Sequence, residues 1–176
     1  RTVMVGILHE AREIERCGFG EVHSPGHDAL QAAEQVINRL RTLAEDDRPF
    51  YLQLGFHEPH RLPASTNDGQ QYSGFVGDYI RSASSKGVTV PPYIADTPAA
   101  REEIAELQGA VSHLDVGVGI VLDELRRLNL DHRTLVVFTT DHGLALPRAK
   151  CSLYDPGIEV ALIVRDAAVG WRGGRT

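Results

Sequence analysis

Short apolar runs that end abruptly on polar residues alternate with longer segments whose apolar residues recur three or four positions apart. The runs over residues 2–8, 50–56 and 134–140 are rich in β-branched and other apolar residues, which is typical of strands. Because the runs over 2–8 and 134–140 are largely unbroken apolar segments, we expect them to be buried, as in a parallel sheet covered on both faces by helices. A last buried strand is expected over residues 158–164, after a turn at 155–157.

The intervening segments are predicted to form two amphipathic helices. Asp28 is expected to cap the first, and Thr97 to cap the second, which has Pro98 in its first turn. Their apolar positions are Leu30, Ala33, Ile37, Leu40 and Leu43 in the first helix, and Ile104, Leu107, Val111, Leu114, Val118, Val121, Leu125 and Leu128 in the second. Gly117 and Gly119 each weaken the second helix by ~1 kcal/mol relative to alanine, and they predict a close approach to the sheet.

The order strand, helix, strand, helix, strand predicts a single α/β domain over residues 1–176, with a mostly parallel sheet flanked by helices. Residues 13–27 show no periodicity and are expected to be loop. Residues 62–96 are rich in Gly, Ser, Pro and Tyr. Because a loop of this length is rare in a compact domain unless it is functional, we expect an excursion on the substrate side.

Composition narrows the function classes. The chain is 42% hydrophobic, enough for a sizeable core, and its net charge of -6 comes from interspersed acids and bases. This pattern argues against a nucleic-acid partner or an anionic membrane surface, and no apolar run approaches the ~20 residues of a membrane span. Cys17 and Cys151 lack the spacing of a zinc site and are expected to be free thiols.

Polar residues follow three of the predicted strands. His9 follows the first, His57 and His60 follow the second, and Asp141 with His142 follows the third. Parallel strands deliver their carboxyl ends to one edge of the sheet, where open α/β folds bind ligands. We therefore look for chemistry at this edge.

Asp141 and His142 are candidate metal ligands. The carboxylate suits Ca²⁺ or Mg²⁺, and the imidazole suits Zn²⁺ or Mn²⁺ better. The alternative is structural: Asp141 caps the following turn, and His142 binds a backbone carbonyl.

The remaining candidates also have two interpretations each. His60, on a turn made rigid by a proline, suits a general acid or an anion ligand, or else is an exposed side chain beside Arg61. Lys150 suits an ammonium placed over an anionic ester, or else is a solvated loop lysine. His9 shares only its place at a strand end, and His113, which lies on the long helix, is expected to form a salt link or a cap.

The combination of segments is more specific than any single residue. Residues 50–61, 114–125 and 135–143, followed by Lys150, Tyr154 and Gly157, resemble the type I sulfatases of the alkaline phosphatase superfamily. Within that family, Asp96-Thr-Pro-Ala-Ala-Arg101 and Phe56-His-Glu-Pro-His-Arg61 resemble the heparan N-sulfatase (sulfamidase) branch. The resemblance implies an alkaline-phosphatase/sulfatase-like α/β fold and a hydrolase of sulfate esters or sulfamates that uses Ca²⁺ and a formylglycine nucleophile.

The resemblance also implies a role for each candidate. Asp141 would be a ligand of the active-site Ca²⁺, and His142 stands where many members have an asparagine that also binds the metal. His60 matches the sulfate-binding histidine that helps to protonate the leaving group, Lys150 matches the cation that holds the sulfate oxygens, and His9 matches the histidine that supports the nucleophile. A divalent metal, an ammonium and an imidazolium aimed at the same oxygens would stabilise the dianionic transition state of sulfuryl transfer.

The chain departs from the family pattern in three ways. Ile7 stands where many members have a lysine, the Cys/Ser-x-Pro-x-Arg motif of the formylglycine is absent, and so are the paired aspartates that complete the metal site. We expect the last two upstream of Arg1, so that residues 1–176 form the central and C-terminal part of a sulfatase-like catalytic domain. This polypeptide alone is then predicted to be inactive and to bind Ca²⁺ weakly.

Two other functions stay open. In a phosphodiesterase or phosphonate hydrolase of the same superfamily, His142 would bind a transition metal, and the nucleophile would be Thr or Ser. Alternatively, a non-catalytic remnant would keep the fold as a binding module. In the leading interpretation the partner is a small-molecule or glycan sulfate or sulfamate, and apolar surface left exposed would favour self-association.

Overall fold

The structure is a computed structural model that describes residues 1–9, 11–26, 28–61, 65–67, 70–72, 74–75 and 87–171. Three parallel strands in the order β2-β1-β3 form its first sheet. These strands are β1 (Thr2–Gly6), β2 (Glu21–His23) and β3 (Tyr51–Gly55). The central strand β1 is fully buried at Val3, Met4 and Val5. The predicted parallel sheet is therefore present.

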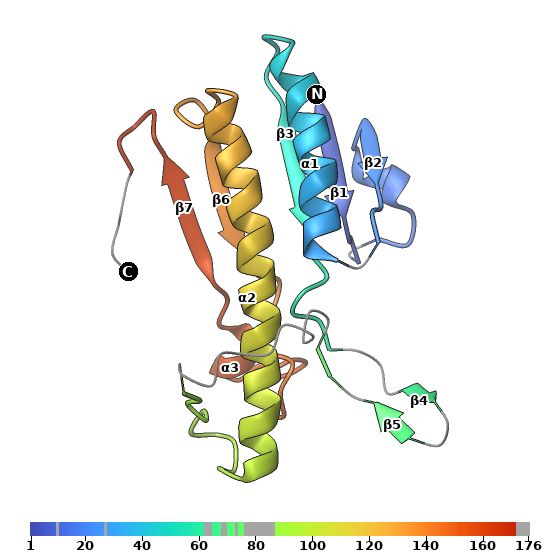
Figure 1. The fold of residues 1–176 in the computed structure, drawn as a ribbon, viewed down its shortest axis with the longest axis vertical. Helices are drawn as coiled ribbons and strands as arrows, with labels where there is room; N and C mark the ends of the chain where they lie inside the picture. The colour runs from blue at the N-terminus through green and yellow to red at the C-terminus, as the bar shows by residue number, and fades with distance from the viewer. Residues whose placement is uncertain are drawn as a thin grey trace.

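A second pair of strands lies beside this sheet. β6 (Leu135–Thr139) pairs antiparallel with β7 (Leu162–Asp166), and no ladder among the described residues joins them to β3. Figure 1 shows that β1, β3 and β6 all point toward the same end of the molecule. The carboxyl ends of these strands therefore lie toward the same end of the molecule.

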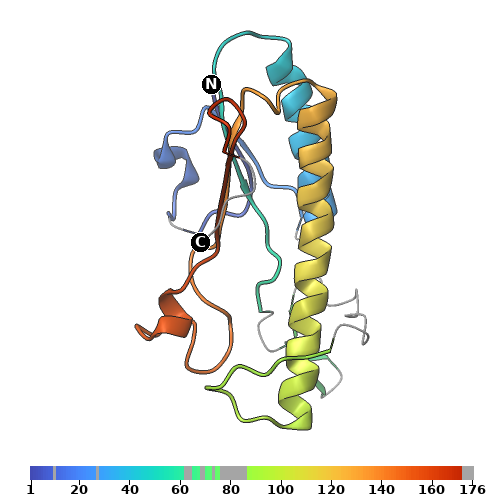
Figure 2. The same ribbon diagram turned by 90° about the vertical axis from the view of Figure 1, so that its left-hand side faces the viewer.

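Two long helices cover one side of the strands (Figure 2). Asp28 caps α1 (Ala29–Ala44) by accepting from the backbone N–H groups of Leu30 and Gln31, and Thr97 caps α2 (Pro98–Arg127). Both caps were predicted. The α/β fold with a mostly parallel sheet and flanking helices is confirmed, and no helix among the described residues is long and apolar enough to cross a membrane.

Short elements complete the fold. They are the 3-10 helix η1 (Ile14–Cys17), the antiparallel hairpin of β4 (Ser65–Asn67) and β5 (Gln70–Tyr72), and the short helix α3 (Asp155–Ile158). Almost half of the predicted excursion over 62–96 lies outside the described residues. Cys17 and Cys151 are free and exposed, as expected.

The apolar core has two parts. The larger one joins β1, α1 and α2 around Val3, Val5, Val36, Leu40, Leu43, Leu125 and Leu130, and Val136 of β6 packs against it. The smaller one lies near the start of α2 and contains Phe75, Ile104, Leu107, Ala110 and Leu146. Helix α2 therefore contributes to both cores and connects the two groups of strands.

Four expectations from the sequence are wrong. The segment 13–27 is not all loop, because it supplies η1 and the edge strand β2. Strand β6 is not buried on both faces, since Leu135 and Val137 are 57% and 53% exposed, and β7 is both later than expected and exposed at Leu162. The turn expected at 155–157 is the first part of α3.

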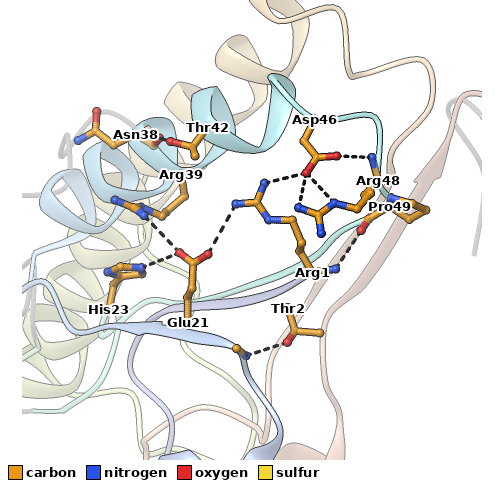
Figure 3. Close-up of polar contacts among 11 residues, drawn as sticks. Arg1, Thr2, Glu21, His23, Asn38, Arg39, Thr42, Asp46, Arg48 and Pro49 are labelled. Carbon is orange, nitrogen blue, oxygen red and sulfur yellow. Dashed lines mark hydrogen bonds and ion pairs between the residues drawn. The ribbon is translucent and has the colours of Figure 1, made fainter.

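Charged residues lie at the opposite end of the first sheet, around Arg1 (Figure 3). The side chain of Arg1 lies between the carboxylates of Glu21 and Asp46, at 3.6 and 3.7 Å, and the terminal ammonium donates to the carbonyl oxygen of Pro49. Hydrogen bonds from Arg48 lower the pKa of Asp46 to about 2. These contacts tie the starts of β1 and β3 together.

Candidate functional site

Three histidine rings gather at the carboxyl ends of β1 and β3. The ring of His9 lies 6.4 Å from that of His57 and 6.2 Å from that of His60, measured between centroids. Both pairs meet edge to face, with interplanar angles of 86° and 88°. The structure thus brings together His9 and His60, two of the residues that the sequence singles out.

A pair of glycines allows this approach. In the register of β1 and β3, Gly6 lies opposite Gly55, and a Cβ on Gly6 would lie 1.9 Å from the carbonyl oxygen of Gly55. Gly6 also has a φ of +97°, a conformation that residues with a side chain rarely adopt. The segments that follow β1 and β3 leave the sheet from this close contact, so that His9 and His57 lie near each other.

The turn from His57 to Arg61, here called the histidine turn, orients His60. The backbone N–H of His60 donates to the carbonyl oxygen of His57 at 2.7 Å, and Nδ1 of its ring lies 2.7 Å from the carbonyl oxygen of Arg61. Because a carbonyl oxygen only accepts, Nδ1 carries the hydrogen in this contact. Nε2 is then the ring atom with which His60 can bind or protonate a ligand.

Arg61 anchors the end of this turn. Its guanidinium forms an ion pair with Glu103 of α2, donates from Nε to the carbonyl oxygen of Ala145 at 3.1 Å, and lies 4.6 Å from the ring centroid of the fully buried Phe75. An arginine that is stacked on a ring and hydrogen-bonded in this way has a structural role. Arg61 therefore fixes the histidine turn to α2.

Asp141 and His142 follow β6 at the same end of the molecule (Figure 1). Nδ1 of His142 lies 2.7 Å from the carbonyl oxygen of Gly143, which is the contact that the structural interpretation expected. Its Nε2 lies 3.4 Å from a carboxylate oxygen of Asp141, whose side chain is 71% exposed. Two atoms bound to one ion at ~2.3 Å can lie this far apart, so the pair fits two neighbouring positions of a metal site.

Lys150 lies in the loop that returns to this strand end. Its backbone N–H donates to the carbonyl oxygen of Leu144, and the N–H of Gly143 donates to the carbonyl oxygen of Gly157 in α3. A Cβ on Gly143 would lie 1.8 Å from the carbonyl oxygen of Pro156. The loop is therefore folded tightly against the residues after Asp141, and a cavity of about 280 Å³ lies beside it, lined by Tyr93, Arg148, Leu153, Tyr154, Asp155 and Pro156.

A second polar cluster is buried behind the histidine turn. Asp28, Glu58 and His113 place one donor atom each within 4.8 Å of one another, a group that could hold a metal ion. Nε2 of His113 lies 3.1 Å from Oδ2 of Asp28 and 3.8 Å from Oε1 of Glu58. The salt link expected for His113 is confirmed. Glu58 was not predicted, although its place between two histidines at a strand end was a signal.

The comparisons with known proteins agree on one family. A family model described as "Sulfatase" matches residues 19–169. The chain is 37% identical to human N-sulphoglucosamine sulphohydrolase, over 93% of this chain and 36% of that protein, and 28% identical to mouse iduronate 2-sulfatase, over 76% of this chain and 29% of that protein. The chain thus spans about a third of the length of these relatives.

Solved structures show the same fold. One described as a putative sulfatase from Bacteroides fragilis matches with a TM-score of 0.60 at 20% identity, over 79% of this chain and 31% of that chain. Another, from work on glycosaminoglycan metabolism by Bacteroides thetaiotaomicron, matches with a TM-score of 0.59 at 22% identity, over 80% of this chain and 30% of that chain.

Proposed function

Because the chain belongs to the sulfatase family, we propose that it is the central and C-terminal part of a metal-dependent catalytic domain that hydrolyses sulfate esters or sulfamates. The observation that carries this proposal is the meeting of His9, His57 and His60 at the carboxyl ends of β1 and β3, while Asp141 and His142 follow β6, which runs toward the same end of the molecule (Figure 1). An edge with imidazoles and a carboxylate suits an anionic substrate held beside a cation.

Each residue then has a role in sulfuryl transfer. His60, whose Nδ1 is bound to the backbone, would present Nε2 to the bridging atom of the leaving group and donate a proton to it. Lys150 would bind the sulfate oxygens, and His9 would support the nucleophile. The nucleophile itself, a formylglycine, is expected on a segment outside residues 1–176.

Asp141 and His142 would hold the divalent metal, which supplies positive charge for the sulfate oxygens. A Ca²⁺ ion takes six to eight oxygen ligands, whereas this strand end offers one carboxylate and one imidazole among the described residues. We therefore propose that the chain alone binds Ca²⁺ weakly and does not turn over substrate.

The substrate class follows from the relatives. N-sulphoglucosamine sulphohydrolase and iduronate 2-sulfatase are named for sulfated sugars, and we propose a sulfated or N-sulfated sugar here too. The cavity between Tyr93 and Tyr154 offers aromatic surface at the side of the predicted excursion, and aromatic faces suit the apolar faces of sugar rings.

A second candidate is a phosphodiesterase or phosphonate hydrolase. It is favoured by one observation: Nε2 of His142 faces the carboxylate of Asp141, a pair that suits Zn²⁺ or Mn²⁺ better than Ca²⁺. Metal identity therefore separates the two candidates.

The test uses the complete polypeptide that contains this chain. We expect hydrolysis of 4-nitrophenyl sulfate or of N-sulfoglucosamine, dependent on Ca²⁺, with little turnover of bis(4-nitrophenyl) phosphate. A preference for the phosphodiester with Zn²⁺ or Mn²⁺ would establish the second candidate. Absence of turnover with every substrate and metal would leave a binding module.

A further inference from the structure

We propose that Glu58, His113 and Asp28 form a buried tie that sets the position of the histidine turn, and that Glu58 is thereby a positioning residue for His60. The proposal rests on the proposed function only in that His60 is the residue positioned. The tie itself joins three elements that are far apart in the sequence: the end of β3, the start of α1 and the middle of α2.

Glu58 connects the turn to α1. It is 4% exposed, and Oε1 accepts from the backbone N–H of Ala29 at 2.8 Å. Ala29 is the first residue of α1, where unpaired N–H groups and the helix dipole favour a carboxylate. The residue between His57 and Pro59 is therefore bound to the amino terminus of a helix rather than to solvent.

His113 connects α2 to the same point. It is 2% exposed, and its Nε2 lies within reach of both carboxylates, at 3.1 Å from Asp28 and 3.8 Å from Glu58. Asp28 uses its other oxygen to accept from the N–H groups of Leu30 and Gln31. One aspartate thus caps α1 and binds α2 at the same time.

Packing around the tie prevents it from shifting. Gly117 lies one turn after His113 in α2, and a Cβ there would lie 3.1 Å from the carbonyl oxygen of Ala29 and 3.2 Å from the ring of Phe56. The glycine thus lets the start of α1 and the end of β3 approach α2 to contact distance. The side chains of Asp28, Glu58 and His113 stand in the same tightly packed junction.

The histidine turn is then held at two points of one helix. Glu58 reaches His113, and Arg61 at the other end of the turn reaches Glu103. These α2 residues are ten positions apart, which corresponds to ~15 Å along a helix. His60 lies between the two anchors, so α2 determines where its ring can point.

Burial makes the tie sensitive to charge. Within the described part of the chain, Oε2 of Glu58 is buried without a hydrogen-bond partner, so this carboxylate depends on the contacts of Oε1. Loss of charge on Asp28 or Glu58 leaves one charged carboxylate, instead of two, beside the imidazole of His113, and so changes the electrostatic interactions of the tie. The same three donors also suit a divalent transition metal, and the experiment separates this alternative.

The test records proton–carbon correlation spectra of the histidine rings in the chain and its variants. Asp28→Asn keeps an oxygen that can cap α1 but loses the charge that faces His113, and Glu58→Gln keeps an acceptor for Ala29. The matched control is Glu124→Gln, which removes another buried carboxylate between α1 and α2, where Glu124 binds Arg41 at 2.8 Å.

We expect the ring signals of His57 and His60 to shift or broaden in Asp28→Asn and Glu58→Gln, and to stay in place in Glu124→Gln. Unchanged signals in the first two variants, or equal changes in the control, would overturn the proposal. A wild-type His113 signal that moves on addition of Zn²⁺ or EDTA would show a metal site in place of a direct tie, and would overturn it too.

Kinetics of the complete polypeptide add an independent readout. We expect Glu58→Gln to lower kcat by about tenfold or more with little change in KM, because misplacing a proton donor affects the chemical step. An unchanged kcat would contradict positioning. If the wild-type polypeptide hydrolyses no sulfate, the proposed function fails, and the ring spectra still decide whether the tie exists.

Discussion

His60 binds the backbone with one ring nitrogen and keeps the other for a ligand. This division arises because Nδ1 lies 2.7 Å from the carbonyl oxygen of Arg61, which itself is anchored on α2. A histidine held in this way presents Nε2 in one orientation, which suits proton transfer to a ligand. The same local contacts explain why Arg61 is structural, whereas its neighbour is the better candidate for chemistry.

Replacing His60 by Gln should affect chemistry far more than folding. In the complete polypeptide we expect kcat/KM to fall by roughly 10²–10⁴, the usual contribution of a general acid, when the leaving group is poor. Steady-state kinetics with an alkyl and a 4-nitrophenyl sulfate measure this, since a nitrophenolate needs little protonation. An equal loss on both substrates would contradict the role of proton donor.

The two glycines of α2 form a matched pair. A Cβ on Gly119 meets nothing within 4 Å, whereas one on Gly117 meets Ala29 and Phe56 at 3.1–3.2 Å. We expect Gly119→Ala to stabilise the chain by about 0.5–1 kcal/mol through helix propensity. Gly117→Ala should be at least ~1 kcal/mol less stable than Gly119→Ala, because crowding offsets that gain. Urea denaturation of both variants tests the difference.

Helix α2 is the element that relates the others to one another. It packs against α1, contributes to both apolar cores, anchors the histidine turn and carries Glu124, which binds Arg41 of α1. Hydrogen bonds from Arg127, together with Arg41, lower the pKa of Glu124 to about 2, and its side chain is 6% exposed. The helix is thus fixed at its last turn as well as at the tie.

The Glu124 contact should make stability depend on acid pH. Since the folded pKa of about 2 is below the ordinary value of 4.5 for a glutamate, the unfolded chain binds the proton more readily. This contribution is therefore full above pH ~4.5 and is lost as the pH falls toward 2. Glu124→Gln should cost about 1–2 kcal/mol at pH 7. The cost should shrink progressively below pH 4.5, as urea denaturation at several pH values would show. A cost that stays constant down to pH 3 would contradict the ion pair.

Sequence signals that act over a few residues, such as helix caps, predicted the secondary-structure elements well. The caps at Asp28 and Thr97 confirm their prediction, because they depend on side chains adjacent to the helix. Burial was harder to predict: Val137 has an apolar sequence context yet is 53% exposed, because pairing, not composition, decides which face is covered. Gly117 makes the predicted close approach and Gly119 does not, since only one of them faces the junction.

The candidate site was predictable to a similar degree. Strand ends placed His9 and His60 near each other, because parallel strands share an edge. The contacts of Glu58 to Ala29 and His113 could not be predicted from the sequence. They join positions that are 29 and 55 residues apart, which no local pattern relates. The roles of His9, His60, Asp141, His142 and Lys150 stay predictions.

Within the described residues, β6 and β7 leave an apolar face exposed to solvent. The exposed side chains of Leu135, Val137, Leu162 and Val164 alternate along β6 and β7, and the pairs Val137–Val164 and Thr139–Leu162 lie opposite each other, so the four share one face. An exposed apolar face on a two-stranded sheet tends to become buried against another protein surface. We propose that the isolated chain self-associates through it.

Sedimentation velocity tests this proposal. The wild-type chain should sediment as oligomers at tens of micromolar, and Val137→Lys should shift it toward monomer, because a charge in the centre of the face opposes burial. Val111→Lys is the matched control, since Val111 is also an exposed valine, at 44%, but belongs to α2 and not to β6 or β7. A monomeric wild-type chain, or equal effects of both variants, would refute the proposal.

The separation of β6 and β7 from the three-stranded sheet implies unequal protection of the backbone from solvent deuterium. Strands β1 and β3 share five paired positions beneath the main core, whereas the two outer strands touch that core through Val136. Cooperative units open at free energies set by their own packing. Amides of β6 and β7 should therefore exchange through a partial opening, well before those of β1. The strand that leads to both Asp141 and His142 would then loosen while the histidine cluster stays folded.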